Sequence, residues 1–93
     1  MATAQVNRWL ARERNRKYLF DYLSSSACVD CGEADVACLQ IDHQRDKLYD
    51  LHRMVKNRIS IKRIDAELEK CHVVCANCHM RRTAKTQGWY KRL

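Results

Sequence analysis

The fold is decided by a short stretch near the C-terminus, CHVVCANCH, which spans residues 71–79. It begins with a β-rich run over residues 71–74 and continues into a Cys-x-x-Cys pair that opens a helix. This helix is predicted to run to about Gln87. Gly88 suits the position after its end, because glycine readily adopts the left-handed backbone that terminates many helices. The sequence therefore predicts a strand, a turn with two thiols and a helix in direct succession.

A matching cysteine pair lies upstream in CVDCG, residues 28–32. Zinc prefers four sulfur or nitrogen ligands in a tetrahedron, and each Cys-x-x-Cys turn supplies two thiolates. Cys28, Cys31, Cys75 and Cys78 therefore predict a closed, structural zinc site. A turn, a strand pair and a helix that carries the second pair resemble a treble-clef zinc finger. The alternative, that the four are simply small buried residues, is disfavoured by the two matched spacings.

The two cysteine pairs are separated by far more than the roughly 15 to 20 residues of the common zinc-site pattern. This spacing argues against a simple DNA-binding finger and indicates that another element is inserted between the pairs. Two further cysteines, Cys38 and Cys71, are expected to be buried, although Cys71 could compete for the metal. Cys38 is expected in the middle of a strand over residues 34–42, where side chains alternate between two faces.

Most of the remaining chain is predicted to be helical. Residues 3–25 carry an apolar stripe that is interrupted by a basic run, which is typical of an amphipathic helix at a surface. Residues 44–59 mix charged and apolar side chains and predict either a short helix or a long loop. Ser60 is a suitable N-cap for a helix over residues 61–69.

With 93 residues, the chain has room for a single domain, residues 1–93. We expect a basic amphipathic helix over residues 1–26, a metal-binding core over residues 27–88 and a tail over residues 89–93. The chain has no Pro and only two Gly, which disfavours a turn-rich all-β sandwich or barrel.

The composition points to a soluble protein with an anionic partner. A net charge of +7 suits a polyanion, of which nucleic acid is the commonest. Hydrophobic residues make up 46% of the chain, which is too many for a disordered tail. No apolar run reaches the roughly 20 residues of a membrane span, and the N-terminus lacks the apolar stretch of a signal peptide. We expect a cytoplasmic protein with no membrane partner.

Three chemistry-bearing residues, Asp42, His43 and His79, are not needed by a four-cysteine site. If zinc holds the end of a strand beside the start of a helix, the three side chains can converge. A carboxylate and an imidazole are ligands for a divalent cation, and a second imidazole is a general base near neutral pH. Because neighbours in a regular strand point to opposite faces, Asp42 and His43 can both face one site only where the strand breaks into a loop.

From about residue 15 to residue 90, this combined pattern resembles a small HNH endonuclease of the zinc-containing, largely phage-borne kind. The resemblance implies a small α+β fold: a zinc-stabilised ββα-metal (His-Me finger) core with an N-terminal helix and a helical insert. It implies that His43 is the general base and that Asp42 and His79 hold one Mg²⁺ or Mn²⁺. The implied reaction is DNA cleavage that leaves 5′-phosphate and 3′-hydroxyl ends.

The middle residue of the HNH pattern has two interpretations here. Many members of the family carry an Asn where Lys70 stands, so Asn77 is the candidate in this chain. It could hold the loop that bears His43 through hydrogen bonds, or it could cap the helix that begins beside it.

The basic residues expected to contact the DNA backbone are Arg12, Arg16, Arg81, Arg82 and Lys85. Arg82 lies three residues after His79, hence on the same helix face, where it could clamp a phosphate. Each of these side chains could instead belong to a solvated helix surface. Two other histidines are weaker candidates: His52 is expected to be solvated, and His72 could face the site from the second strand.

Two functions are therefore compared. The first is a metal-dependent DNA endonuclease. Its sequence specificity is expected to be low, because few residues remain to contact DNA bases. Family context suggests partners in phage DNA packaging or recombination. The alternative is a non-catalytic, zinc-containing DNA-binding module. Such a module would use the same cysteines and charge but would not need Asp42, His43 and His79, so we favour the nuclease. A protein-interaction zinc module is disfavoured by the charge.

Overall fold

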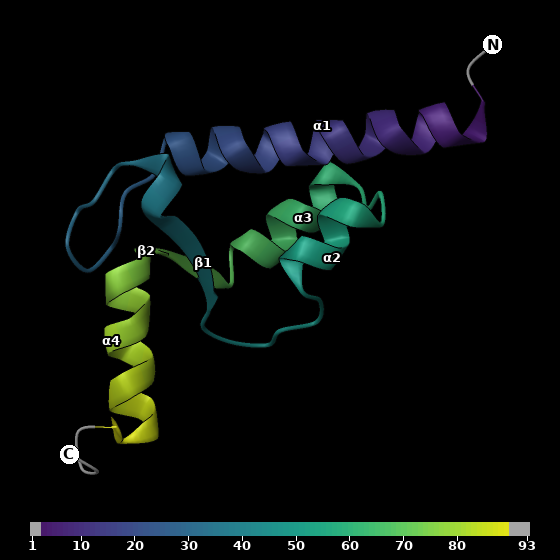
Figure 1. Cartoon of the computed structure of the whole chain (residues 1–93). Helices are drawn as coiled ribbons and strands as arrows, with labels where there is room; N and C mark the ends of the chain where they lie inside the picture. Colours follow the sequence, from purple (N-terminus) through teal and green to yellow (C-terminus); the bar gives the residue numbers. More distant parts are fainter. Residues whose placement is uncertain (1–2, 90–93) are drawn as a thin grey trace.

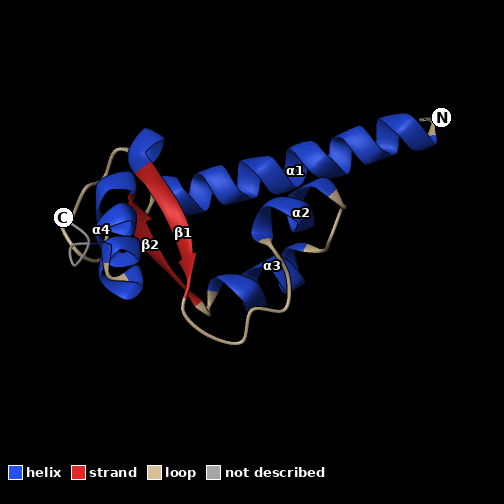
Figure 2. Cartoon of the chain, turned by 60° about the horizontal axis from the view of Figure 1, so that its bottom comes forward, coloured by secondary structure: helices blue, strands red, loops and turns tan. Residues whose placement is uncertain are grey.

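The computed structural model describes residues 3–89. Its elements follow in the order α1 (Ala4–Ser24), the 3₁₀ helix η1 (Val36–Cys38), β1 (Leu39–His43), α2 (Leu51–Lys56), α3 (Ile61–Leu68), β2 (Cys71–Cys75) and α4 (Ala76–Gln87). The two strands pair antiparallel, from Leu39 opposite Cys75 to His43 opposite Cys71. Figures 1 and 2 show α4 continuing from β2, with α2 and α3 inserted between the strands. The predicted small α+β class with a helical insert is confirmed.

Local capping explains most helix boundaries. Thr3 begins α1 by accepting a hydrogen bond from the Val6 amide, and Ser60 begins α3 by accepting one from the Arg63 amide. Gly88 ends α4 with a left-handed backbone at φ 67°. The predicted helices over residues 3–25 and 61–69 and the predicted end of α4 are thus confirmed to within a residue. The expected tail lies outside the described residues apart from Trp89.

The strand expected over residues 34–42 is wrong in its first half. The carboxylate of Asp35 accepts a hydrogen bond from the Ala37 amide at 3.0 Å and begins η1 instead. A short polar side chain that bonds the nearby backbone in this way competes with a sheet ladder. Cys38 therefore lies in η1, half-buried, and β1 begins only at Leu39.

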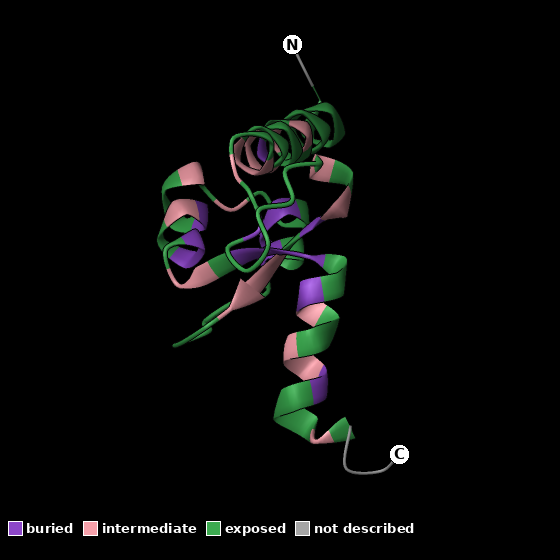
Figure 3. Cartoon of the chain, turned by 90° about the vertical axis from the view of Figure 1, so that its left-hand side faces the viewer, coloured by how far each residue is buried: buried purple, intermediate pink, exposed green. Residues whose placement is uncertain are grey.

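Two hydrophobic clusters form the interior. The sheet core consists of Cys28, Leu39, Val73, Val74, Cys75 and Cys78. The insert core consists of Leu51, Met54, Ile64 and Leu68. Tyr22 of α1 packs against both clusters, so α1 braces the sheet and the insert together. Figure 3 shows these buried segments gathered beneath α1, with exposed residues along most of that helix.

A polar anchor sets the position of α1 on the insert. Asn15 is completely buried, and its Nδ2 atom donates to the carbonyl of Ile59 at 3.0 Å and to that of Val55 at 3.5 Å. Tyr18 adds a hydrogen bond to Asp65 of α3. Beyond this anchor, the N-terminal turns of α1 project past the other elements (Figure 1). Among the described helices, none combines the length and apolar character needed to cross a membrane.

Candidate functional site

Four cysteines from two distant segments meet where the sheet joins α4. Cys28 and Cys31 lie in the turn after α1, Cys75 ends β2 and Cys78 lies in the first turn of α4. Their four sulfur atoms all lie within 4.8 Å of one another. No other His, Cys, Asp or Glu cluster of this kind occurs between residues 3 and 89. The four cysteines could hold a structural metal such as zinc, as their spacing predicted.

The first cysteine pair is shaped by its own turn and by β2. The Gly32 amide donates to the Cys28 carbonyl at 2.8 Å, and Gly32 has φ 83°, a conformation that other residues adopt only with strain. The Val29 amide donates to the Val73 carbonyl of β2 at 3.0 Å. This long-range bond fixes the turn beside the second cysteine pair.

The second pair is shaped by the start of α4, and here one expectation is corrected. Cys75 caps the helix, because its Sγ accepts a hydrogen bond from the Cys78 amide. Asn77 therefore does not cap α4; it is exposed in the first turn. Among the described residues, its side chain makes no hydrogen bond to the segment that carries His43, so the arrangement supports neither suggested role for Asn77.

The electrostatics of the cluster fit a cation. Burial raises the pKa of Cys28, but hydrogen bonds from backbone amides outweigh burial and lower that pKa to about 6. Burial and the three neighbouring sulfurs raise the pKa of Cys78 to about 12. Without a cation, the four thiols cannot all ionise, because like charges repel at this distance. A bound divalent cation favours deprotonation of its thiol ligands, so this donor set fits zinc.

The two cysteines outside the cluster are structural. Cys38 is half-buried against the sheet core. Cys71 is half-buried in β2, its Sγ donates to the Glu67 carbonyl at 3.2 Å, and burial raises its pKa to about 11. Cys71 is not part of the four-cysteine cluster, so its geometry gives no support to a competing role in metal binding.

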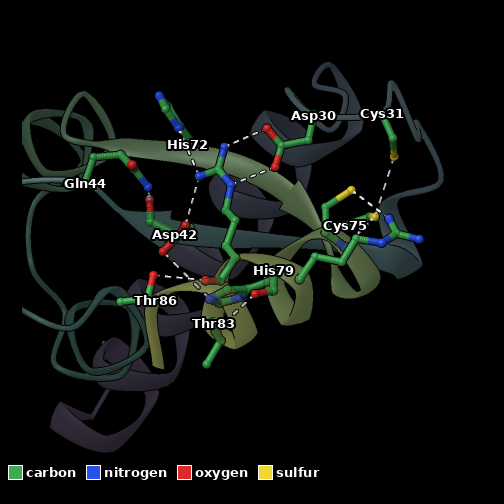
Figure 4. A network of polar contacts seen from close by, with 12 residues as sticks. Asp30, Cys31, Asp42, Gln44, His72, Cys75, His79, Thr83 and Thr86 are labelled. Carbon is green, nitrogen blue, oxygen red and sulfur yellow. Dashed lines mark hydrogen bonds and ion pairs between the residues drawn. The ribbon is translucent and has the colours of Figure 1, made fainter. Parts of the chain in front are cut away.

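Asp42 of β1 and His79 of α4 are brought together beside the cysteine cluster (Figure 4). The Asp42 Oδ1 atom lies 3.7 Å from the His79 Nε2 atom, which is longer than a hydrogen bond. The other ring nitrogen, Nδ1, lies 2.7 Å from Gln40 Oε1 and donates to it. The Gln40 contact orients the His79 ring so that Nε2 faces Asp42.

Arg82 contacts the second carboxylate oxygen of Asp42, Oδ2. Its Nη1 atom donates to Asp42 Oδ2 at 3.0 Å, while Nε and Nη2 donate to the two carboxylate oxygens of Asp30 at 2.7 and 2.8 Å. Nη1 also lies 3.2 Å from His72 Nδ1. The helix-face prediction for Arg82 and His79 is confirmed, since both reach Asp42. These contacts occupy the guanidinium, so Arg82 is not free to clamp a phosphate in this arrangement.

His43 lies on the opposite side of the sheet. Its Nε2 atom is 2.9 Å from Glu67 Oε2 of α3, and Lys70 Nζ donates to the other Glu67 oxygen at 2.7 Å. Glu67 is 2% exposed. Burial raises the pKa of Glu67, but hydrogen bonds from Lys70 and His43 outweigh burial and leave that pKa below its usual value.

The strand ends at His43, as expected, but it stays regular through Asp42 and His43, so the expectation that both side chains face one site is wrong. The Gln44 amide still donates to the Lys70 carbonyl at 2.8 Å. Neighbouring side chains then point to opposite faces: Asp42 pairs with His72, and His43 with Cys71. Asp42 and His79 converge, but the side chain of His43 is held by α3.

An open hollow at the end of the sheet still connects the two faces. It has a volume of about 450 Å³. Its lining residues are Asp42, His43, Gln44, Arg82, Lys85 and Thr86. Both the base candidate and one cation-ligand candidate therefore border a single solvent-accessible space.

The remaining basic candidates are spread over two helices. Arg81 and Lys85 are exposed on α4, where Arg81 Nη1 donates to Cys78 Sγ at 3.4 Å. Arg12 and Arg16 are exposed on α1 and line a different, apolar groove. His52 is exposed on α2, as expected for a solvated residue, and His72 faces Asp42 and Arg82 from β2.

Sequence reasoning missed four residues of this region: Gln40, Asp30, Glu67 and Lys70. Gln40 could have been found, because it lies two residues before Asp42 and therefore on the same face of the strand. Glu67 lies three residues after Ile64, on the buried stripe of its helix, which marks it as a charged residue in need of a partner. Nothing in the local sequence of Asp30 indicated its distant arginine partner.

No family model, no curated protein and no solved structure matches the chain. The functional interpretation therefore depends on the residues and their arrangement.

Proposed function

We propose that this protein is a metal-dependent DNA endonuclease of the HNH kind. The observation that carries the proposal is the approach of Asp42 and His79 beside the cysteine cluster, with His43 on the border of the same hollow. These are the three residues that the motif selects. The net charge of +7 suits a DNA substrate.

In this proposal, Cys28, Cys31, Cys75 and Cys78 bind a structural zinc ion. The ion supplies stability to a chain whose sheet has only two strands. Because it joins the turn after α1 to the start of α4, it keeps β1 and α4 in contact. The four-cysteine set leaves no open coordination position, so the chemistry belongs to other residues.

His43 is the proposed general base. The low pKa of Glu67 makes it a carboxylate at neutral pH, so it accepts a hydrogen bond from His43 Nε2. His43 then keeps the lone pair of Nδ1 for a proton from water. Glu67 would orient the ring and stabilise its charged form after proton transfer.

Asp42 and His79 are the proposed ligands of a catalytic Mg²⁺ or Mn²⁺, and Gln40 orients the His79 ring. Such a cation would neutralise charge that develops on the phosphate and the leaving oxygen. Arg82 holds one Asp42 oxygen and leaves the other facing His79. Lys85, on the rim of the hollow, and the neighbouring Arg81 are proposed to contact DNA phosphates.

The alternative, a non-catalytic zinc-containing DNA-binding module, is favoured by two contacts. Arg82 neutralises Asp42, and Glu67 engages His43, so both chemical groups have structural partners. A binding module would retain these ion pairs for stability alone. The two functions differ in one measurable property, which is cleavage that depends on a divalent cation.

A plasmid-nicking assay with and without Mg²⁺ tests the proposal. We expect His43→Ala to lower the cleavage rate by about 10² to 10⁴, the usual contribution of general-base catalysis, with zinc content and DNA affinity retained. His52→Ala is the matched control, because His52 borders a second hollow with His43 but lies outside the hollow that Asp42 and His43 line. It should cut like the unmodified protein. Wild-type cleavage by His43→Ala, or no cleavage by any form, would favour the binding module.

Variants of the cation ligands give a second, independent readout. Asp42→Ala and His79→Ala should lose activity in Mg²⁺ and regain part of it at high Mn²⁺ concentration, since each removes one ligand of two. His43→Ala should not respond to Mn²⁺. If all three variants respond alike, the assignment of base and ligands is wrong.

A further inference from the structure

The α1 helix has two apolar faces, and only one of them is used by the fold. Its inner face packs against α2, α3 and the sheet through Tyr18, Leu19 and Tyr22. Its outer face carries Val6, Trp9 and Phe20, which are 44%, 58% and 56% exposed. Large apolar side chains exposed on one face of a helix can contribute to an interaction surface.

The outer residues follow a coiled-coil spacing. Val6, Trp9, Glu13, Arg16, Phe20 and Leu23 are separated alternately by three and four residues, the a and d positions of a heptad pattern. We call these six residues the outer stripe; its last member, Leu23, is half-buried and also packs against the sheet core. The stripe is apolar at both ends and carries one acid and one base at its centre. Such a row stays on one face of a helix over its whole length.

This stripe is complementary to itself when read in reverse. In two antiparallel copies, Val6 would lie opposite the partner's Leu23, and Trp9 opposite the partner's Phe20. At the centre, Glu13 and Arg16 already pair within one helix at 3.2 Å, and in the antiparallel arrangement each would also lie opposite the unlike charge of the partner. A parallel arrangement would instead place Glu13 against its own equivalent, which is unfavourable.

A groove in the same protomer lies beside the C-terminal end of the outer stripe. It has a volume of about 600 Å³ and lies between α1, η1 and α2. Phe20 and Leu23 form one wall, and Val36 and Val55 contribute to the other side. The N-terminal turns of α1, which project beyond the body in Figure 1, carry the apolar side chains that a second copy could place there.

We propose that the outer stripe is a dimer interface, in which two copies of this chain pair through α1 in antiparallel orientation. The projecting end of each α1 lies along the groove of the other protomer, and the interface is isologous. Trp9 and Phe20 are its aromatic anchors. The pairing assigns Arg16 to the interface rather than to DNA, and Arg12 lines the groove beside it.

Sedimentation equilibrium of the zinc-loaded chain tests this pairing. The experiment is run from micromolar to millimolar protein under reducing conditions, because Cys38 and Cys71, which lie outside the metal cluster, could otherwise link copies covalently. We expect a monomer–dimer equilibrium. Trp9→Glu should raise the dissociation constant by at least about 30-fold, the effect of losing one aromatic hot spot. Leu48→Glu is the matched control, since Leu48 is 70% exposed outside the stripe, and it should leave the dimer unchanged.

A charge exchange at the centre tests the orientation without changing an apolar residue. Glu13→Arg alone should weaken the dimer, because it places a positive charge opposite the partner's Arg16. The double variant Glu13→Arg with Arg16→Glu should restore it, because unlike charges meet again in the antiparallel register. Circular dichroism of each variant checks that the fold is retained.

Two results would overturn the proposal. A chain that remains monomeric up to millimolar concentration would assign the stripe to a different partner, such as DNA or another protein. A dimer that Trp9→Glu leaves intact, or that the double exchange does not restore, would place the interface elsewhere. Neither result depends on whether the protein cleaves DNA.

Discussion

The two hydrophobic clusters of this small protein are built on different principles. The sheet core contains three of the four clustered cysteines, and Tyr22 and Leu23 of α1 pack against it. The insert core consists of four aliphatic and thioether side chains from α2 and α3, with tyrosines of α1 above them. A core of Leu, Ile and Met is stabilised by burial, whereas the four clustered cysteines could also hold a structural metal such as zinc.

The two clusters hold different residues of the proposed active site. The cysteine cluster holds the elements that carry Asp42 and His79, whereas the insert core holds α3, which carries Glu67. His43 connects the two, since it lies on β1 and bonds to Glu67. The proposed active site thus lies at the junction of the sheet core and the insert core, and α1 braces both.

The largest effect is expected when the sheet core loses its cation. Cys75→Ser, or a strong zinc chelator, should unfold the sheet and α4, because structural zinc supplies about 10 to 16 kcal/mol of apparent binding energy in small zinc-finger peptides. Elemental analysis should find one zinc per chain before treatment, and circular dichroism should report the loss of structure after it. A folded chain that retains its Tm without metal would show that the sheet core is stable on apolar contacts alone.

The insert core should respond to a cavity instead. Ile64 is completely buried, so Ile64→Ala should lower the free energy of unfolding by about 2 to 5 kcal/mol. Zinc stoichiometry should not change, because the sheet core is separate. Urea denaturation followed by circular dichroism measures the first quantity, and elemental analysis the second. Loss of zinc in this variant would show that the two clusters are one cooperative unit.

The anchor between α1 and the insert should have a smaller effect. Asn15→Ala removes the donor to the Ile59 and Val55 carbonyls and should lower the free energy of unfolding by about 1 to 3 kcal/mol. Asn7→Ala, at an exposed position of the same helix, is the matched control and should have almost no effect on urea denaturation. Equal effects of both variants would show that the buried amide does not anchor α1.

The ion pairs of Glu67, at the junction of the two clusters, should make the stability of the fold depend on pH. The pKa of Glu67 in the folded chain lies below its usual value of 4.5, so its charged form stabilises the fold. That contribution is present above pH 4.5 and is lost as the pH falls through the lowered folded pKa. The Tm difference between the unmodified chain and Glu67→Gln should therefore shrink on acidification. Because both proteins lose metal in acid, their difference isolates Glu67; a constant difference would contradict the ion-pair interpretation.

The smallest effect is expected at Cys38. This thiol packs against the sheet core but lies outside the four-cysteine cluster. Cys38→Ser should leave the zinc stoichiometry at one per chain and lower the Tm by only a few degrees. It is the control for Cys75→Ser, since both change Cys to Ser. Loss of metal in Cys38→Ser would redefine the ligand set.

The sequence by itself determined the features that depend on near neighbours. Thr3, Ser60 and Gly88 set helix ends because capping acts within a few residues. The two Cys-x-x-Cys spacings predicted the four-cysteine cluster because each pair needs only one turn. Asp35 is an exception. The alternation of side chains predicted a strand, but the hydrogen bond between the Asp35 carboxylate and the Ala37 amide begins η1 instead.

Only the tertiary structure decided which partner each chemical group has. His43 bonds to Glu67 24 residues away, His79 meets Gln40 39 positions earlier, and Arg82 pairs with Asp30 across 52 positions. Strand pairing decides these contacts, because the register determines which face each side chain occupies. The motif therefore identified Asp42, His43 and His79, but the pairing placed Asp42 and His79 on one face and turned His43 towards α3.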